Sequence, residues 1–460
     1  MIDGLRPYAE MKQSGLPWLG FIPEGWHARR AKYSFQEVDD RSEQGDEELL
    51  SVSHKTGVTP RSQKNVTMFL AESYEGHKVC RPSDIVVNTM WAWMAAIGVS
   101  RHHGLISPAY AVYRPRSSDR FEPRYLDYLL RTETYRAEYV RRSRGITTSR
   151  LRLYPPDFLS IPLLQPPVDE QRRIVRFLDW HGAQTAKLIR AKRKSLSLFT
   201  EQLRCTLRTA VTRGFAEQTP TKPTNVPWIG DIPIDWDVSR IKAELDCLNH
   251  KRVPLSATER GRMTVRSYDY YGASGKIDRV DDFIFDDELI LVAEDGANLL
   301  SRSLPLAIIA RGRFWVNNHA HVLKPRRGDV RFLAALLESL NYTPWISGAA
   351  QPKLTKERMM AISIAVPSAI MQSAIMDAAE LRTARVRVAI DTLSREVTLI
   401  QEYRARLIET VAFGKLDVRS IAKSLPEISP DEAEAEIQAD DAPEITDDEL
   451  DGDVGEAAAA

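Results

Sequence analysis

The sequence predicts an α+β fold, in which two duplicated mixed α/β domains are joined by two long helices. The helices are expected to pair as an antiparallel coiled coil with pseudo-twofold symmetry. Three observations predict this fold. Residues 168–213 contain no proline and a single glycine, most of what precedes this stretch recurs after it, and the second long stretch has an apolar heptad pattern. A helix over 168–213 would span roughly 70 Å at about 1.5 Å per residue, longer than an ordinary globular helix.

The composition is that of a large protein of the reducing cytoplasm. The 460 residues, 43% of them hydrophobic, allow about three domains. No apolar run reaches the ~18 residues that span a bilayer, and the first residues lack an apolar signal core. Cys80, Cys205 and Cys247 are far apart and suggest neither a disulfide framework nor a zinc site. We therefore expect a cytoplasmic protein with no membrane partner.

The charge is unevenly distributed along the chain. There are 63 basic and 63 acidic residues, but 14 of the acidic ones lie between Glu427 and Glu456, which leaves 49 in a body of about +14. A basic body favours a polyanionic partner, although solvated surface Lys and Arg would give the same excess. The tail, 415–460, is predicted to be mostly disordered. It either only solvates the protein or competes with nonspecific nucleic acid for the body.

The first repeated element is rich in Trp, Pro and Gly. Residues 14–32 read SGLPWLGFIPEGWHARRAK and residues 224–242 read TNVPWIGDIPIDWDVSRIK, with identities that include both tryptophans. Such matching predicts an internal duplication, and Pro and Gly at these spacings predict an extended, turning segment. We expect the tryptophans to anchor the segment to the domain that follows. The alternative is a Trp/Pro surface that grips a ligand.

Two mixed segments, 33–165 and 243–366, follow the Trp-rich elements. Apolar runs predict strands at 84–88, 109–113, 288–292 and 319–323, and helical patterns follow at 125–130 and 332–337. Gly145 and Leu151 match Gly348 and Leu354. The flanks of the two segments resemble each other and their middles do not, which indicates one scaffold that has diverged in what it recognises.

The predicted domains are 1–166 and 215–366, with the long helices at 167–214 and 367–414. Gly214 and Gly414 are placed to end the helices in the left-handed conformation. Apolar residues recur at alternating steps of four and three in the second helix, and the first has the same register with Thr185, Lys192 and Thr206 as polar interruptions. Each helix could instead pack on its own domain. The predicted seam consists of Ile189, Leu196, Phe199, Leu203, Val386, Ile390, Leu393, Val397, Ile400, Leu407 and Val411.

No catalytic constellation or metal site is evident in the sequence. The glycine-containing stretch 272–276 is too short for a P-loop, and no Cys/His spacing suits a metal. We therefore expect no cofactor bound by this chain. Basic, hydroxyl and amide side chains suited to phosphates and base edges gather in a few predicted loops, any one of which could be a plain surface turn. The candidate DNA-binding residues are Arg141, Arg142, Arg144, Thr147, Thr148, Ser149, Arg150, Tyr271, Lys276, Asn317, Asn318, His319, Gln351, Lys353 and Lys356.

Several strings resemble those of one known family. They are the stretches 15–26, 166–171, 271–277, 292–296 and 317–321. With the order of domains and helices over about residues 11–416, they resemble the specificity (S) subunit of type I restriction-modification enzymes (HsdS-like). One departure is visible: Glu170-Gln171 becomes Met371-Gln372 at the second helix, so that helix start is expected to be capped differently.

The resemblance implies a non-catalytic DNA reader with two target-recognition domains. Each domain would read one half of a bipartite, asymmetric site in double-stranded DNA. The paired helices would dock two modification (methyltransferase) subunits, and two restriction subunits would join them. S-adenosylmethionine, ATP and Mg would then be bound by those partners. The alternatives are a stand-alone two-module DNA-binding regulator and an interaction scaffold that binds no DNA.

Overall fold

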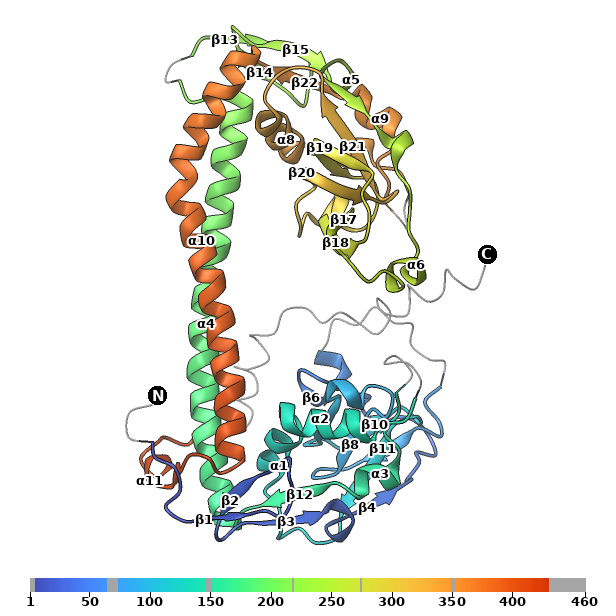
Figure 1. Cartoon of the computed structure of the whole chain (residues 1–460), viewed down its shortest axis with the longest axis vertical. Helices are drawn as coiled ribbons and strands as arrows, with labels where there is room; N and C mark the ends of the chain where they lie inside the picture. Colours follow the sequence, from blue (N-terminus) through green and yellow to red (C-terminus); the bar gives the residue numbers. More distant parts are fainter. Residues whose placement is uncertain are drawn as a thin grey trace. The chain divides into compact units, whose positions relative to one another are not determined.

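The computed structural model describes residues 5–63, 73–145, 151–216, 219–273, 275–348 and 352–429. The chain divides into two compact units: unit 1 contains residues 1–194 and 395–460, and unit 2 contains residues 195–394. Two long helices, α4 (Val168–Arg213) and α10 (Ala369–Ala412), contribute residues to both units (Figure 1). Helix α4 has the bounds of the stretch that the sequence predicts as helical.

Unit 1 contains a four-stranded antiparallel sheet flanked by smaller ladders. The order of the sheet is β4-β11-β8-β9, formed by β4 (Phe35–Val38), β11 (Ala111–Pro115), β8 (Ile85–Val87) and β9 (Ile97–Val99). The ladders pair β1 (Met11–Gln13) with β2 (Phe21–Pro23), β3 (His27–Arg30) with β12 (Pro162–Gln165), β5 (Leu50–Ser53) with β6 (Gly57–Pro60), and β7 (Lys78–Cys80) with β10 (Gly104–Ile106). The short helices are α1 (Pro123–Leu130), α2 (Glu133–Arg142), α3 (Pro155–Leu159) and α11 (Arg419–Ala422).

Unit 2 contains a six-stranded sheet of order β16-β21-β19-β20-β17-β18. Its strands are β16 (Leu245–Cys247), β21 (Ala320–Pro325), β19 (Phe285–Ala293), β20 (Ala307–Val316), β17 (Tyr268–Gly272) and β18 (Gly275–Val280), and only the β17–β20 pairing within it is parallel. Smaller ladders pair β13 (Thr221–Pro223) with β14 (Asp231–Pro233) and β15 (Asp237–Arg240) with β22 (Ser363–Val366). The short helices are α5 (Ile241–Glu244), α6 (Ala257–Gly261), α7 (Asn298–Ser301), α8 (Val330–Ser339) and α9 (Lys356–Ala361).

The predicted elements of the two middle segments are present, with shifted ends. Strand β8 lies within 84–88, β19 contains 288–292, and α1 and α8 contain the two predicted helical patterns. The prediction at 109–113 begins two residues before β11, because Tyr110 N–H donates to the Ser107 carbonyl in a turn that precedes the strand. The prediction at 319–323 likewise begins one residue before β21.

Aromatic rings anchor the Trp-rich elements to the domains that follow them, as predicted. Trp18 meets Tyr135 edge-on with 5.4 Å between ring centroids, and Trp228 meets Trp345 at 5.0 Å. Trp236 packs edge-on against Phe332 at 5.9 Å. Aromatic pairs of this geometry contribute stability beyond the area that they bury. They fix the hairpins β1–β2 and β13–β14 onto their own units.

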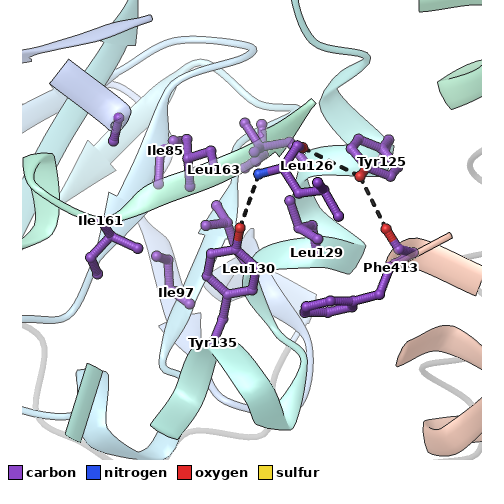
Figure 2. Packing of buried hydrophobic residues seen from close by; sticks show 14 of the residues in the cluster. Ile85, Ile97, Tyr125, Leu126, Leu129, Leu130, Tyr135, Ile161, Leu163 and Phe413 are labelled. Carbon is purple, nitrogen blue, oxygen red and sulfur yellow. Dashed lines mark hydrogen bonds between the residues drawn. The ribbon is translucent and has the colours of Figure 1, made fainter. Parts of the chain in front are cut away.

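The end of α10 is inserted into the core of unit 1. Figure 2 shows Phe413 beside Tyr125 and Tyr135 in this cluster, and the Tyr135 and Phe413 ring centroids are 5.9 Å apart. Tyr125 Oη donates to the Ala412 carbonyl at 3.1 Å. Gly414 follows with φ +67°, and Gly214 ends α4 with φ +70°, so both have the predicted left-handed conformation.

In unit 1 the residues of α4 and α10 run antiparallel. Lys192 Nζ lies 2.7 Å from Glu396 Oε2, while a small cavity is lined by Leu178 and His181 of α4 and by Arg404 and Leu407 of α10. Lower numbers on α4 therefore meet higher numbers on α10. In unit 2, Ala210 and Val211 of α4 share a core cluster with Ile375, Met376 and Ala379 of α10.

The predicted seam residues are buried or half-buried, whereas several apolar residues of the same helices that lie off the seam are exposed. Leu198, Leu381, Val388 and Leu399 are all more than 60% exposed. The seam residues Ile189, Val397, Leu407 and Val411 are buried, and Leu196, Phe199, Leu203, Val386, Ile390, Leu393 and Ile400 are half-buried. Two of the polar interruptions are satisfied within their own helix, because the hydroxyls of Thr185 and Thr206 donate to carbonyls one turn earlier. The third, Lys192, pairs with Glu396 of the other long helix.

A buried glutamine ties each long helix to the short helix of its domain. Gln171 Nε2 donates to the Pro166 carbonyl at 2.8 Å and its Oε1 accepts from Glu122 N–H at 2.7 Å. In unit 2, Gln372 Nε2 donates to the Pro367 carbonyl at 3.0 Å and its Oε1 accepts from Asp329 N–H at 3.0 Å. These bonds satisfy backbone groups at the ends of α1, α4, α8 and α10 that would otherwise be buried without partners.

The residue before each glutamine differs, and so do the helix starts. Glu170 accepts a hydrogen bond from Tyr8 Oη and lies within the first turn of α4. At the helix start of α10, the Met371 N–H donates to Ser368 Oγ at 3.4 Å, whereas in α4 the Glu170 N–H donates to the Pro167 carbonyl at 2.9 Å. The predicted difference in capping is therefore present.

An ion pair between a short and a long helix also occurs in both units. Arg124 of α1 lies 2.6 Å from Asp179 of α4, and Arg331 of α8 lies 2.9 Å from Glu380 of α10. The first pair is mostly buried, with side chains 15% and 6% exposed, while Glu380 is 53% exposed. We call these pairs the inner brace and the outer brace. Over the described ranges, no helix is long and apolar enough to cross a bilayer.

Candidate nucleic-acid interface

The first two candidate residues lie in a helix, not in a loop as predicted. Arg141 and Arg142 form the last turn of α2, where cations favour the helix C-terminus. Both donate to the buried Glu138, at 2.7 to 3.0 Å. Burial works against the charge of Glu138, but the bonds from the two arginines outweigh it and lower the pKa of this carboxyl. The two guanidinium groups are thus already engaged, Arg142 more fully because only 22% of its side chain is exposed.

Arg144 begins a short backbone ladder that leads back into the core. Arg144 and Arg152 exchange both backbone hydrogen bonds, at 2.9 and 3.0 Å, and Arg144 Nη2 lies 3.0 Å from Asp157 Oδ1. The next residue, the buried Leu153, donates its N–H to the Thr89 carbonyl at 3.0 Å. The Arg144 side chain remains 70% exposed. Thr147, Thr148, Ser149 and Arg150 lie outside the described residues.

The same ladder occurs in unit 2. Ser347 and Lys353 exchange backbone bonds at 2.9 and 2.7 Å, and Leu354 N–H donates to the Glu294 carbonyl at 2.8 Å. Leu153 therefore corresponds to Leu354, and the sequence match of Leu151 with Leu354 is wrong by two residues. The error arises because the two ladders enclose segments of different length, so the glycines and the leucines cannot both align without a gap. Gln351 lies outside the described residues, and Lys356 is exposed in the first turn of α9.

Most of the other candidate residues of unit 2 are brought together beside this ladder. Asn317 N–H donates to the Tyr271 carbonyl at 3.0 Å, and Tyr271 pairs with Lys276 across the β17–β18 hairpin. His319 carbonyl accepts from Glu294 N–H at 2.9 Å. Asn317 itself is only 7% exposed, so its amide serves the turn and is not available to a ligand. Asn318 offers its carbonyl to Arg252 at 3.1 Å.

Glu294 is the charged centre of this region, although it is not among the DNA-binding residues predicted from the sequence. Its carboxylate accepts from Arg252 Nη1 at 2.6 Å and lies 3.5 Å from Lys353 Nζ. Burial opposes ionisation of Glu294, yet the bond from Arg252 and the surrounding cations hold its pKa below the ordinary value. His321 beneath it is a neutral ring: Nε2 donates to the Leu354 carbonyl at 2.7 Å, so Nδ1 accepts from Asn249 Nδ2 at 2.9 Å.

The β17–β18 hairpin and the residues that precede it contain cations that are not among the predicted DNA-binding residues. Lys276 and Arg279 both pair with Asp269, at 2.7 and 3.2 Å, while Arg260 and Arg266 pair with Asp278. Ile277 between them is 51% exposed. Alternating charge along 276–279 was the available signal, but the pairing across the strands could not be read without knowing their register.

Unit 1 has an aromatic segment at the position that Glu294 occupies in unit 2. The β8–β9 connection contains Trp91 and Trp93, whose rings stack with centroids 6.1 Å apart. Arg152 Nη2 reaches Met90 Sδ at 3.7 Å. The tether from Leu153 to Thr89 places the basic ladder against this connection, as the tether from Leu354 to Glu294 does in unit 2. The same backbone frame thus holds aromatic and thioether groups in unit 1 and charged groups in unit 2.

Comparison with known proteins shows which proteins this chain resembles. Residues 233–379 match the model of the type I restriction modification DNA specificity domain. A stretch of 139 residues is 33% identical to the putative type I restriction enzyme specificity subunit S.HindORF215P of Haemophilus influenzae (strain ATCC 51907 / DSM 11121 / KW20 / Rd), and it covers 30% of this chain and 34% of that protein. The match thus spans about a third of the length of this curated relative.

The fold is also similar to that of a chain in a solved structure described as "Structural basis underlying complex assembly and conformational transition of the type I R-M system". The TM-score is 0.51 at 16% identity, over 85% of this chain and 98% of that one. Residues 233–379 therefore resemble a type I restriction modification DNA specificity domain. The likeness to type I specificity proteins thus rests on sequence over part of the chain and on the fold over most of it.

Proposed function

We propose that this chain is the DNA sequence-specificity subunit of a type I restriction-modification complex. It reads a bipartite, asymmetric site in double-stranded DNA, one half with the domain of unit 1 and the other with the domain of unit 2. The two domains are copies of one scaffold related by a pseudo-twofold axis, and α4 and α10 form the coiled coil that sets their spacing. The chain catalyses no reaction itself.

The observation that supports this proposal most directly is the repeated tether. In both units a basic ladder is bonded through a buried leucine to the connection after a central strand. The chemistry displayed on that frame differs: Trp91, Trp93 and Arg152 in one unit, and Glu294, His319 and Lys353 in the other. A shared frame with different side chains is what two readers of different half-sites require, because base edges are distinguished by the groups that face them.

The partner subunits follow from the same proposal. Two methyltransferase subunits would dock on the helix pair and supply S-adenosylmethionine chemistry at adenine, and two restriction subunits would add ATP- and Mg-dependent cleavage. Co-purification of the chain with an adenine methyltransferase, followed by mapping of methylated adenines, tests this. Methylation at one bipartite motif is expected. Salt-dependent DNA binding without any partner would favour the stand-alone regulator, and no DNA binding by the complex would favour the scaffold.

A domain exchange tests the assignment of half-sites. Residues 33–150 are replaced by the corresponding segment of another specificity subunit, and the methylated motif is mapped again. Only one half of the motif should change, because the other half is read by unit 2. A change in both halves, or in neither, would refute the two-reader arrangement.

A further inference from the structure

The short connection between β20 and β21 holds one candidate base-reading side chain in a fixed orientation. Asn317 shapes this turn: its Oδ1 accepts from His319 N–H at 2.9 Å, and its own N–H donates to the Tyr271 carbonyl at 3.0 Å. On the other side, Glu294 N–H donates to the His319 carbonyl at 2.9 Å. The backbone of the turn is therefore fastened to both neighbouring strands, while the His319 side chain is 48% exposed.

Asp295 determines which edge of the His319 ring faces outward. Both of its carboxylate oxygens lie close to His319 Nδ1, at 3.0 and 2.9 Å, and its side chain is only 14% exposed. An ionised carboxylate can only accept, so Nδ1 must carry the proton that it shares with Asp295. The remaining ring nitrogen, Nε2, is then the atom that His319 can offer to a ligand.

The carboxylate is itself held in place. Asp295 forms a backbone bridge with Lys353, and the neighbouring Gly296 N–H donates to the Pro352 carbonyl at 3.1 Å. Lys353 Nζ and Arg252 are directed to Glu294 instead, so that the cations beside Asp295 are neutralised by a different acid. Glu294 thus balances the charges of Arg252 and Lys353, which leaves Asp295 to orient the His319 ring. Asp295 itself is mostly covered.

We propose that His319 reads a base edge in the half-site recognised by unit 2, with Asp295 as the positioning residue that aims it. With Nδ1–H committed, Nε2 accepts a hydrogen bond from an exocyclic amine, which is N6 of adenine or N4 of cytosine in the major groove. This inference rests on the proposed function, because it names the residue that makes one base contact at the site proposed above. Lys276 and Lys353, whose ammonium groups are single point charges, are expected to contact phosphates without discriminating between bases.

The test uses the complex of this chain with its methyltransferase subunits and a pool of duplexes randomised over the second half-site. His319→Ala should lower discrimination at a single base pair roughly tenfold, without changing the first half-site. Asp295→Asn should lower discrimination at the same base pair to a smaller extent. His319→Gln retains a hydrogen-bond acceptor, so it should retain part of the discrimination that His319→Ala loses. The matched control is His27→Ala, an exposed histidine in β3 of unit 1, which should leave the second half-site unchanged.

Replacing the amino-bearing base at the relaxed position with an analogue that lacks the exocyclic amine provides the complementary arm. With the analogue, the discrimination of the wild-type complex should fall to the level of His319→Ala. The affinity of His319→Ala should be the same for the analogue and for the natural base. An unchanged preference in His319→Ala, or a loss of affinity that is equal for all sequences, would overturn the inference while leaving the proposed function intact. A wild-type complex that prefers no sequence would instead overturn the proposed function.

Discussion

The inner brace offers a direct test of how strongly the domain of unit 1 is fastened to its long helix. Asp179→Asn keeps the size of the side chain but removes the charge that faces Arg124. Asp179 is 4% exposed and also accepts from Tyr128 Oη at 2.7 Å. The substitution leaves a guanidinium that is 15% exposed without its main counter-charge. Breaking a buried pair from one side costs about 3–5 kcal/mol, and the residual exposure of Arg124 reduces our expectation to about 2–4 kcal/mol.

The outer brace provides a comparison at lower burial. Glu380→Gln removes the corresponding charge in unit 2, but Glu380 is 53% exposed, and Arg331 retains Asp329 and Asp377 at 2.7 and 2.9 Å. We therefore expect a loss below about 1 kcal/mol. Asp169→Asn, at a carboxylate 83% exposed in the first turn of α4, is a control on the same helix as Asp179.

Hydrogen exchange of the backbone amides of α1 and α8 is the suitable measurement, because the two units need not unfold together. In Asp179→Asn, protection in α1 should fall about 30- to 700-fold, which corresponds to the expected range at 1.4 kcal/mol per tenfold. In Glu380→Gln, protection in α8 should fall by less than about fivefold. Equal effects in the two variants would show that burial does not set the strength of these braces, and would refute the reasoning.

Three further perturbations test the packing around the long helices and the neutral His321. Gly414→Ala should lower the free energy of unfolding of unit 1 by about 2–4 kcal/mol, because φ is +67° and a Cβ would lie 2.6 Å from Pro23 Cγ. The control is Gly20→Ala, where φ is +64° but the space around a Cβ is open; it should cost only about 1 kcal/mol in urea unfolding. Lys192→Leu gains about 1 kcal/mol of apolar burial but loses a partly exposed ion pair worth about 0.2–1 kcal/mol; a melting temperature lower than wild type would mean that Lys192 does not face the seam. Burial lowers the pKa of His321 below 6.5, so its contribution to stability is present above pH 6.5 and is lost as the pH falls from there, by up to about 1.4 kcal/mol per pH unit. His321→Gln should flatten the urea-unfolding profile of unit 2 between pH 7.5 and 5.5, and an unchanged slope would contradict this.

The features that the sequence determined are those set by local chemistry. A long stretch without proline forms α4 over the predicted residues because helical hydrogen bonds join neighbours only four residues apart. Gly214 and Gly414 end their helices because a left-handed residue favours glycine. The Trp-rich elements, the two short helices α1 and α8, and the positions of strands β8 and β19 are likewise determined by spacing and residue type. Five short strings and the order of domains and helices carried the resemblance to the HsdS-like family.

The tertiary structure decided which polar groups are available and which are engaged. Arg141 and Arg142 read as a basic loop, yet they end a helix and neutralise a buried carboxylate, Glu138. Glu294 and Asp295 lie in the family-like stretch 292–296, but they were not among the predicted DNA-binding residues. Their partners His319, Arg252 and Lys353 lie 24, 42 and more than 50 residues away. The correspondence of Leu153 with Leu354 was also visible only in the fold. Segments of unequal length precede the two leucines and shift the sequence match, whereas the backbone hydrogen bond of each leucine shows that the two positions are equivalent. Contacts between distant residues depend on how the chain folds back on itself, and local residue patterns carry no record of that.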